Sequence, residues 1–433
     1  MARLGVSMRK MKDSGIEWIG QIPSDWKCCK QKYLITLLNG RAYKDSEFEE
    51  DGKYKILRVG NLFTNPVWYS SSLELEPNKY CQDGDLLYSW SMSYAPVIWH
   101  GEKVIYHYHI WKTVLSEKIS KMFAYYYLIS LTNALQAEIH ETTMGFITMG
   151  VMNNAYIAFP PLAEQQRIAD FLDEKCGEID SIRSDVQREI EILNDYKKSV
   201  ITEAVTKGLN PKAKLKDSCI EWIGKIPEGW NVFRIKYLAT EPNTLFTDGD
   251  WINGDIITED GIRYLTSGNV GEGKFKYQGE GHISLETFNE MHCLKAVPGD
   301  LMICRLNLPI GRCCIIPDDE PFYVIAVDNV ILRPNSNVDK KYAMYCMNTP
   351  GYAMEAEMAA GGTTMKRISR TDLGNLRIPV PPLPEQKAIA DYLDEKCSEI
   401  DATIADKQKQ LETLDEYKKS LIFEYVTGKK EVP

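Results

Sequence analysis

Two segments of this chain, 221 residues apart, have nearly the same sequence. Residues 160–176 read PPLAEQQRIADFLDEKC, and residues 381–397 read PPLPEQKAIADYLDEKC. Aligning 160–206 with 381–427 requires no gap and gives 28 identities in 47 positions. A second pair opens each half of the chain, KDSGIEWIGQIP at 12–23 and KDSCIEWIGKIP at 216–227. The chain is therefore a duplication, and its fold must contain two related halves.

The closing segment of each half is expected to be a long helix. A Pro-Pro pair precedes it, no proline occurs beyond its first turn, where the second copy has Pro384, and glycine returns as a terminator only at Gly208 and Gly428. Gly177 is its only internal glycine. Apolar residues recur at steps of three and four, which is typical of a coiled coil. About 45 residues at 1.5 Å each predict a rod of roughly 65–70 Å.

An apolar stripe of this length needs a partner helix. A homodimeric coiled coil would provide one, and so would packing of the two copies on each other within one chain. Two copies of equal length in the same chain favour the second arrangement.

The blocks between these matching ends look largely unrelated to each other. They contain short β-rich runs, such as YKILRV at 54–59 and LMIC at 301–304, separated by Gly, Asn and Asp. The sequence therefore predicts an α+β protein with two globular domains alternating with two long helices. The expected division is 1–159 for the first domain, 160–210 for the first helix, 211–380 for the second domain and 381–433 for the second helix.

The net charge of −10 is unevenly distributed. The two helical segments hold −8 of it, so the globular blocks are close to neutral and can carry local basic patches. No apolar run is long enough for a membrane span, and the first residues lack the apolar region of a secretory signal. Eleven cysteines without metal or redox spacing indicate reduced thiols. We therefore expect a cytoplasmic protein without a membrane partner.

No catalytic motif emerges from the sequence. GNVGEGKF at 268–275 nearly fits a phosphate-binding loop, but Phe275 replaces the magnesium-binding hydroxyl and a glycine-rich hairpin explains it better. His107 and His109 could offer two metal ligands on one strand face, but no third ligand is apparent and packing is the commoner role of such a pair.

Three themes shared by the globular blocks suggest nucleic-acid contacts. The first is a polar loop before each helical segment, rich in hydroxyl and guanidinium donors that suit phosphates and base edges. A solvated connector would look much the same. Its candidate residues are Thr142, Thr143 and Thr148 in the first half, and Thr363, Thr364, Lys366, Arg367 and Arg370 in the second.

The second theme is a Gly-Asp step leading into a strand and a polar loop. Its candidates are Tyr88, Ser89, Trp90 and Tyr94 in the first half, and Arg305, Asn307 and Arg312 in the second. The third theme is a Gly-Asn pair after a strand, with Arg58, Asn61, Ser267 and Asn269 as candidates. Arginine and asparagine can contact bases bidentately. A core position for Trp90 and plain turns at Asn61 and Asn269 are the alternatives.

The pattern GIEWIGxIPxxW, a variable block, then PPLxEQxxIAxxLDEK and a long helix, all repeated, resembles the specificity subunit of type I restriction–modification systems. The resemblance covers both ends of both halves, roughly 120 of the 433 residues. In the variable blocks it extends only to the Gly-Asp theme and the threonine-rich loop.

This resemblance implies a pseudo-twofold architecture in which the two helices form an antiparallel intramolecular coiled coil. Each globular block would be a target recognition domain that reads one half of a split, asymmetric DNA site. The helices would dock two modification (methyltransferase) subunits, and restriction (translocase/nuclease) subunits would join them. The chain itself would have no catalytic activity and no cofactor, with S-adenosylmethionine, ATP and Mg²⁺ on the partner subunits. Asp173, Glu174 and Lys175 would then lie on the coiled-coil surface or a docking face. The alternatives are a coiled-coil scaffold without DNA specificity and a self-sufficient enzyme.

Overall fold

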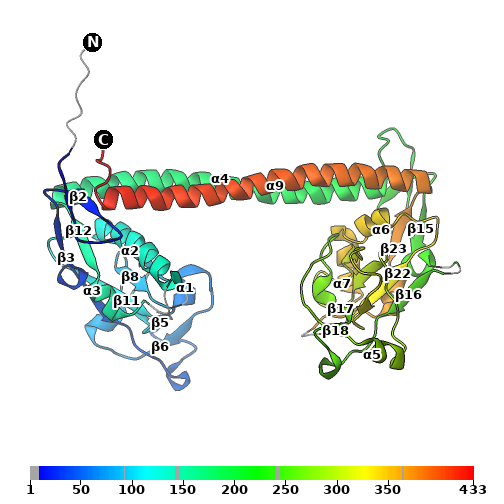
Figure 1. Cartoon of the computed structure of the whole chain (residues 1–433), viewed down its shortest axis with the longest axis horizontal. Coiled ribbons are helices and arrows are strands. Elements are labelled where there is room, and N and C mark those ends of the chain that lie inside the picture. Colours follow the sequence, from blue (N-terminus) through cyan, green and yellow to red (C-terminus); the bar gives the residue numbers. More distant parts are fainter. Residues whose placement is uncertain (1–8, 92, 142–146, 240, 242, 363–364) are drawn as a thin grey trace, which may run out of the picture. The chain divides into compact units, whose positions relative to one another are not determined.

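The computed structural model describes residues 9–91, 93–141, 147–239, 241, 243–362 and 365–433. The chain divides into two compact units (Figure 1). The first contains the chain up to Gln187 together with Lys409–Pro433, and the second contains Arg188–Gln408. Two long helices, α4 (Leu162–Lys207) and α9 (Leu383–Val426), each contribute to both units. The α+β class with two long helices is thus confirmed, while the boundaries drawn from sequence stay a prediction.

The first unit contains two four-stranded sheets, ordered β4-β11-β8-β9 and β6-β5-β10-β7. Two short pairs, β1-β2 and β12-β3, complete its strands. The helices α1, α2 and α3 belong to the same unit. The bounds are β1 Met11–Asp13, β2 Gln21–Pro23, β3 Lys27–Lys30, β4 Ile35–Asn39, β5 Tyr54–Leu57, α1 Val59–Phe63, β6 Tyr69–Ser71, β7 Tyr80–Cys81, β8 Leu86–Ser89, β9 Ala95–Ile98, β10 Val104–Tyr106, β11 Ile110–Leu115, α2 Lys121–Glu141, α3 Met149–Asn154 and β12 Tyr156–Phe159.

The second unit repeats this plan with a four-stranded sheet β16-β22-β19-β20 and a three-stranded sheet β18-β17-β21. Its short pairs are β13-β14 and β15-β23. The bounds are β13 Leu215–Asp217, β14 Lys225–Pro227, β15 Asn231–Arg234, β16 Leu245–Asp248, β17 Ile262–Leu265, β18 His282–Ile283, α5 Leu285–Glu290, β19 Leu301–Cys304, β20 Cys313–Ile315, β21 Val324–Ile325, β22 Asn329–Arg333, α6 Lys340–Cys346, α7 Pro350–Met358, α8 Arg370–Asn375 and β23 Arg377–Val380.

The strand pairing shows that the two variable blocks share one fold. In the first unit β5 and β10 run parallel, with Leu57 opposite Tyr106. In the second, β17 and β21 run parallel, with Leu265 opposite Ile325. The glycine that follows β4 or β16 is equivalent as well. A Cβ on Gly40 would lie 2.3 Å from the carbonyl oxygen of His107, and one on Gly249 would lie 2.2 Å from that of Ile325, so only glycine fits at either position.

In both units α4 and α9 pack side by side and run in opposite directions. In the first unit Asp180 pairs with Lys418 at 2.6 Å, and Arg183 pairs with Asp415 at 2.7 Å. In the second unit Lys197 pairs with Asp401 at 2.6 Å. The Asp180–Lys418 and Lys197–Asp401 pairs are the same interaction repeated at the 221-residue offset. The antiparallel intramolecular coiled coil is therefore confirmed, and α4 finds its partner within the chain.

The repeated closing sequence holds each helix on its own globular block. The side chain of Gln165 is fully buried, accepts the Ser120 N–H and donates to two carbonyl groups. Gln386 makes the same three bonds in the second unit, accepting from the Asp339 N–H at 2.8 Å. The indole of Trp26 donates to Glu164, and that of Trp230 donates to Glu385.

Asp173 is a third such anchor, since it accepts a hydrogen bond from the Tyr126 hydroxyl at 2.6 Å. Asp394 accepts the equivalent bond from Tyr345 at 2.7 Å. The expectation that Asp173 serves only the coiled-coil surface or a docking face therefore missed its contact with the globular block. Glu174 does lie on the exposed helix surface, where its carboxylate meets Lys175.

The opening sequence of each half packs on the end of the helix from the other copy. In the first unit Ile16, Ile22 and Trp26 share a core with Leu421 and Val426 of α9. In the second, Ile223, Ile226 and Trp230 share a core with Ala204 and Val205 of α4. In the first unit nearly the whole chain separates these two segments in sequence, whereas in the second unit only the short connection after α4 separates them.

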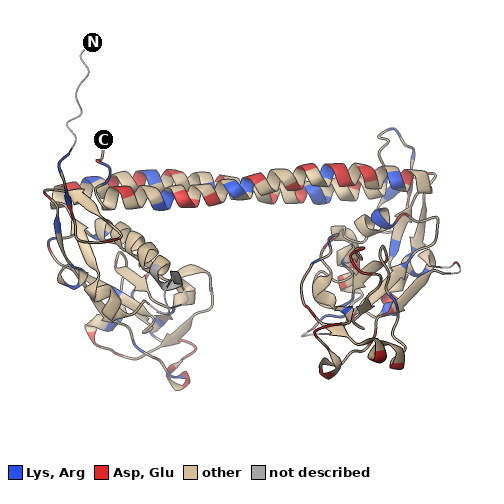
Figure 2. Cartoon of the chain, viewed as in Figure 1, with Lys and Arg blue, Asp and Glu red and all other residues tan. Residues whose placement is uncertain are grey.

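Charged residues of both signs alternate along α4 and α9 (Figure 2). No helix in the described part of the chain is long and apolar enough to cross a membrane. All eleven cysteines are free thiols.

Candidate nucleic-acid interface

The Gly-Asp step anchors the start of an equivalent strand in each unit. Asp85 accepts the Gln82 N–H and forms an ion pair with Lys112 at 2.6 Å. Asp300 is fully buried, accepts the Val297 N–H and pairs with Arg333 at 2.7 Å. Each aspartate therefore fixes the beginning of β8 or β19 to the neighbouring strand, which places the residue after the strand at a defined position.

Trp90 and Arg305 occupy that defined position in the two units. The backbone N–H of Trp90 donates to the carbonyl of His109 at 3.1 Å, and the indole donates to that of Tyr108 at 2.7 Å. The backbone N–H of Arg305 donates to the carbonyl of Asp328 at 2.9 Å, and the guanidinium donates to that of Val327 at 2.5 Å. One structural role is thus filled by an aromatic ring in one unit and by a cation in the other.

In the second unit, Arg305 is the buried member of a cluster of three arginines and two aspartates. Asp248 pairs with Arg305 at 3.1 Å and with Arg370 at 3.3 Å, while Asp328 pairs with Arg367 at 3.0 Å. Arg305 is only 6% exposed, and burial lowers its pKa more than Asp248 raises it. The side chains of Arg367 and Arg370 remain 43% and 45% exposed, so they can still reach a phosphate or a base edge.

Arg312 has a different role from this cluster. Its guanidinium donates to the carbonyl oxygens of Val270, Ser267, Leu306, Asn307 and Pro309, at 2.9–3.3 Å. These bonds tie the loop after β19 to the loop after β17. Arg312 therefore holds the loop that presents Asn307, and its donors are occupied in this structure.

Asn307 is exposed on that loop and has a left-handed backbone with φ of +59°. Its N–H donates to the carbonyl of Lys366, which brings the Gly-Asp loop and the polar loop together. The ammonium of Lys366 forms an ion pair with Glu357. The structure thus gathers Arg305, Asn307, Lys366, Arg367 and Arg370 at one place, as a shared DNA surface would require.

The two Gly-Asn asparagines close loops. Asn61 accepts the Arg58 N–H and donates to the carbonyls of Asn65 and Val67. Asn269 is 2% exposed, accepts the Thr266 N–H and donates to the carbonyls of Lys276 and Gln278. The structure thus agrees with the alternative that both asparagines form turns, and both side-chain amides are hydrogen-bonded within the protein. Ser267 is half-buried and donates to Asn329 at 3.2 Å.

In the first unit, Tyr88, Trp111 and Trp90 form a stack of rings. The Tyr88 and Trp111 centroids lie 5.6 Å apart, and those of Trp111 and Trp90 lie 5.7 Å apart. Tyr88 is fully buried, its hydroxyl meets Thr132, and burial raises its pKa to about 12. Ser89 is also buried, and Tyr94 packs at the edge of the core. Trp90 is half-buried at the outer end of the stack, so one part of its ring packs on the core and another part stays accessible for binding.

The polar loops are described in part. Thr142, Thr143, Thr363 and Thr364 lie outside the described residues. The hydroxyl of Thr148 caps α3 by accepting the Val151 N–H, and Ser369 caps α8 in the same way through Asp372. Thr148 is exposed.

His107 and His109 lie between β10 and β11, with ring centroids 4.7 Å apart. Burial and the neighbouring His109 lower the pKa of His107 to about 4, and burial also lowers that of His109. Both rings are therefore neutral at physiological pH. Among the described residues no group of three or more His, Cys, Asp or Glu side chains could hold a metal ion.

Sequence reasoning missed the acidic partners of the arginine cluster. Asp248 ends β16 and Asp328 lies in the turn before β22, 80 residues apart in sequence, so only the sheet pairing brings them together. It also missed Tyr43, Phe48 and Tyr69 around Arg58. The runs of aromatic and charged residues at 41–48 and 67–69 were the available signal.

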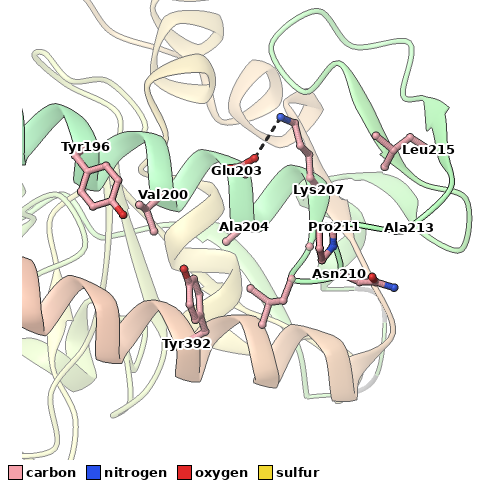
Figure 3. A pocket seen from close by; sticks show the side chains of 12 residues that line it. Tyr196, Val200, Glu203, Ala204, Lys207, Asn210, Pro211, Ala213, Leu215 and Tyr392 are labelled. Carbon is pink, nitrogen blue, oxygen red and sulfur yellow. Dashed lines mark ion pairs between the residues drawn. The ribbon is translucent and has the colours of Figure 1, made fainter.

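A recess of about 740 Å³ lies beside the end of α4 in the second unit (Figure 3). The side chains of Tyr196, Val200 and Tyr392 line one part of it, and Lys207 pairs with Glu203 at 3.5 Å at another. Ala204 also lines the recess. In the first unit the equivalent of Ala204 is Tyr425, whose ring packs on Phe171 at 4.5 Å.

Comparison with known proteins identifies the class to which this architecture belongs. The family model described as type I restriction modification DNA specificity domain matches twice, over residues 23–191 and 227–413. The chain belongs to this family. DNA recognition within a restriction–modification system is therefore its function, and the predicted non-catalytic subunit is supported over a scaffold without DNA specificity. DNA and other subunits of such a system are its partners.

Individual relatives agree with this assignment. The chain is 27% identical over 420 residues to the type I restriction enzyme MjaVIII specificity subunit of Methanocaldococcus jannaschii, covering 94% of each chain. It is 22% identical to the EcoBI specificity subunit of Escherichia coli, over 88% of this chain and 81% of the relative. A solved structure from a study of complex assembly and conformational transition of the type I system has the same fold, with a TM-score of 0.68, 16% identity and coverage of 94% and 98%.

Proposed function

We propose that each unit reads one half of a bipartite DNA target and that the two half-sites differ. The observation that carries this proposal is the shared position after β8 and β19, where the first unit has Trp90 and the second has Arg305. Two sites with the same fold but different chemistry would read different bases. The full target is then asymmetric.

The surroundings of that position support the same reading. In the second unit Arg367 and Arg370 stand exposed beside Arg305, and guanidinium groups suit guanine edges and phosphates. In the first unit the turn that accepts the two hydrogen bonds of Trp90 carries His107, Tyr108 and His109, which suit stacking and directional hydrogen bonds.

We further propose that α4 and α9 dock two copies of one modification subunit. Tyr196 of α4 and Tyr417 of α9 are equivalent in the repeat, and both are 56% exposed. Large exposed rings at repeated positions suit recurring contacts with identical partners. Restriction subunits would join this assembly. S-adenosylmethionine, ATP and Mg²⁺ would bind to the partners, in a bacterial or archaeal cytoplasm.

Co-production of this chain with its modification subunit, followed by sequencing of methylated adenines in the host DNA, tests the proposal. The expected result is one split, non-palindromic sequence. Arg367→Ala and Arg370→Ala should relax or weaken recognition of one half only. Arg234→Ala, which removes a guanidinium from β15 of the same unit, should leave the sequence unchanged. A palindromic target, or loss of both halves in either cluster variant, would contradict the proposal.

A further inference from the structure

The first unit contains a pocket of about 500 Å³ between Tyr43, Arg58 and His107. Its floor is formed by Ile56, which belongs to a small core with Tyr80 and Ile105. Aromatic rings and polar groups surround the opening. The pocket therefore combines aromatic rings with polar groups, which suits a small planar ligand.

The aromatic walls are held in place by contacts with one another and with cations. The rings of Phe48 and Tyr69 lie 4.7 Å apart, and the guanidinium of Arg58 lies 5.0 Å from the Tyr69 centroid. Arg41 lies 5.2 Å from the Tyr43 ring and pairs with Glu47 at 2.6 Å. Preformed rings of this kind provide stacking surfaces for a base.

The polar rim contains both donors and acceptors. Within the described part of the chain, no hydrogen bond or ion pair engages the guanidinium of Arg58 or the carboxylate of Asp45. Nδ1 of His107 accepts the His109 N–H at 3.5 Å, and the ring is neutral because burial lowers its pKa to about 4. The proton of His107 is therefore on Nε2, which becomes a donor.

This set of groups matches one nucleobase better than the others. Guanine carries two acceptors, O6 and N7, which suit Arg58 and the Nε2–H of His107. Its N1–H and N2–H₂ donors suit the carboxylate of Asp45. Adenine presents an amino donor where guanine has O6, and therefore pairs less well with a guanidinium.

The pocket chemistry is specific to the first unit. The strand pairing makes Thr266 the equivalent of Arg58, and Ala326 the equivalent of His107. Gly281, whose carbonyl accepts the Tyr264 N–H, stands where the first unit has Tyr69. The second unit thus lacks the guanidinium, the imidazole and the ring at these positions, so the set is not a requirement of the shared fold.

From these observations we infer that the pocket formed by Tyr43, Asp45, Phe48, Arg58, Tyr69 and His107 binds a guanine base that has left the DNA stack. The inference rests on the proposed reading of DNA by this unit and adds a second mode to it. A base inside a duplex exposes only its edges, whereas a concave recess with aromatic walls takes a base that projects from the helix.

The test measures binding of the full-length chain to three labelled duplexes by fluorescence anisotropy. One duplex contains a single unpaired guanine, one a single unpaired adenine, and one is fully paired. The unpaired guanine should bind about tenfold more tightly than the paired duplex, because stacking and one set of base contacts contribute on that scale. The adenine duplex should lie between them.

Arg58→Lys keeps the charge but loses the planar fork, and Tyr69→Leu keeps an apolar residue but loses the ring. In each variant, the affinity for the duplex with the unpaired guanine should come within about twofold of the affinity for the paired duplex. Asp45→Asn should reduce the preference for guanine over adenine. Lys55→Ala removes a cation from β5 outside the pocket and should preserve the preference.

Equal binding of all three duplexes by the unchanged chain would overturn the inference, and so would a guanine preference that survives both Arg58→Lys and Tyr69→Leu. Adenine methylation by the complex with modification subunits is measured in parallel. If methylation is sequence-specific while the guanine preference is absent, the pocket inference fails and the proposed function stands. If methylation lacks sequence specificity, the proposed function itself fails.

Discussion

The arginines of the second unit differ in what their guanidinium groups do. Arg312 donates to five carbonyl oxygens and fastens two loops, whereas Arg367 and Arg370 each pair with one aspartate and stay half exposed. All three were equally plausible DNA contacts in the sequence. Their difference depends on which carbonyl groups lie within reach, and this is set by the sheet rather than by neighbouring residues.

Replacing Arg312 with alanine should destabilise the second unit. The loss leaves several loop carbonyl groups without their donor, and bonds to a charged group contribute most, so the free energy of unfolding should fall by about 2–3 kcal/mol. Thermal unfolding measures the change. Arg370→Ala, which removes a more weakly tethered guanidinium, should cost less than about 1 kcal/mol; an equal loss in both variants would contradict the division of roles.

His107 should make the first unit sensitive to acid. Its folded pKa of about 4 lies below the ordinary value of 6.5, so the unfolded chain takes up the proton first as the pH falls. The contribution of neutral His107 to the free energy of unfolding is fully present above pH 6.5 and is lost as the pH falls from 6.5 to about 4. Urea midpoints at pH 7 and pH 4.5 should therefore differ more for the natural chain than for His107→Gln. An identical difference in both would refute the assignment.

At the level of elements, the repeated closing sequence is explained by the bonds it makes to its own domain. Gln165 and Gln386 each join the helix to a loop and to the strand end that precedes it. The adjacent Gln166 is exposed, and among the described residues its side chain bonds only to Asp170 of α4. Two neighbouring glutamines on one helix thus have different roles, and only the first is identical in both copies.

Gln165→Leu should therefore be far more damaging than Gln166→Leu. The first leaves the buried carbonyl of Pro160 and two partly buried groups, the Ser120 N–H and the Lys118 carbonyl, without partners, at a cost of about 3 kcal/mol in the free energy of unfolding. The second changes an exposed side chain and should stay within about 0.5 kcal/mol. Thermal unfolding of both variants is the measurement, and similar midpoints would show that the buried bonds do not anchor the helix.

The ion pair Lys197–Asp401 should contribute to helix pairing in the second unit. Lys197→Glu places two acids side by side and should lower stability, while the double change Lys197→Glu with Asp401→Lys should restore it only in part, because Asp401 also pairs with Lys274 at 2.8 Å. Because both side chains are partly exposed, the coupling is about 0.5 kcal/mol. A double-mutant cycle measures it, with the equivalent Asp180–Lys418 pair as an independent repeat. A coupling of zero in both pairs would mean that apolar packing alone sets the register.

The helices could be predicted from sequence because their information is local. Apolar spacing, the absence of proline beyond the first turn and the terminal glycines all lie within one segment. The relation between the two variable blocks could not be predicted, because it consists of strand pairs such as Leu57 with Tyr106 and Leu265 with Ile325. These residues need only be apolar. For the same reason the burial of Asn269 and Arg305, which depends on distant strands, was not apparent.

At the level of the whole molecule, the shared fold makes the two recognition blocks interchangeable in principle. The short 3₁₀ helices Gln31–Tyr33 and Ile235–Leu238 occupy equivalent places before the first sheet strand, and β12 and β23 close the blocks. The matching ends continue into the same helix contacts. A block should therefore fold in either position.

A chain in which residues 34–155 are replaced by residues 238–376 should carry the same recognition surface twice. Such a protein should direct methylation to a twofold-symmetric sequence, since both half-sites would be read by the same side chains. Sequencing of methylated adenines in a host that produces it with the modification subunit tests this expectation. Retention of the original asymmetric target would show that the helices, and not the blocks, choose the bases.

The first unit is built from both ends of the chain. The ammonium of Lys429 donates to the carbonyl of Gln21, and Gly428 lies against Pro23 under the ring of Trp26. These contacts would therefore also form in a chain that is cut in the loop at 208–214. A circular permutant, opened at this loop and joined from the last residue to the first, should keep every interaction described above. Two separate half-length polypeptides, each with one recognition block and one helix, should likewise be able to assemble into the same structure.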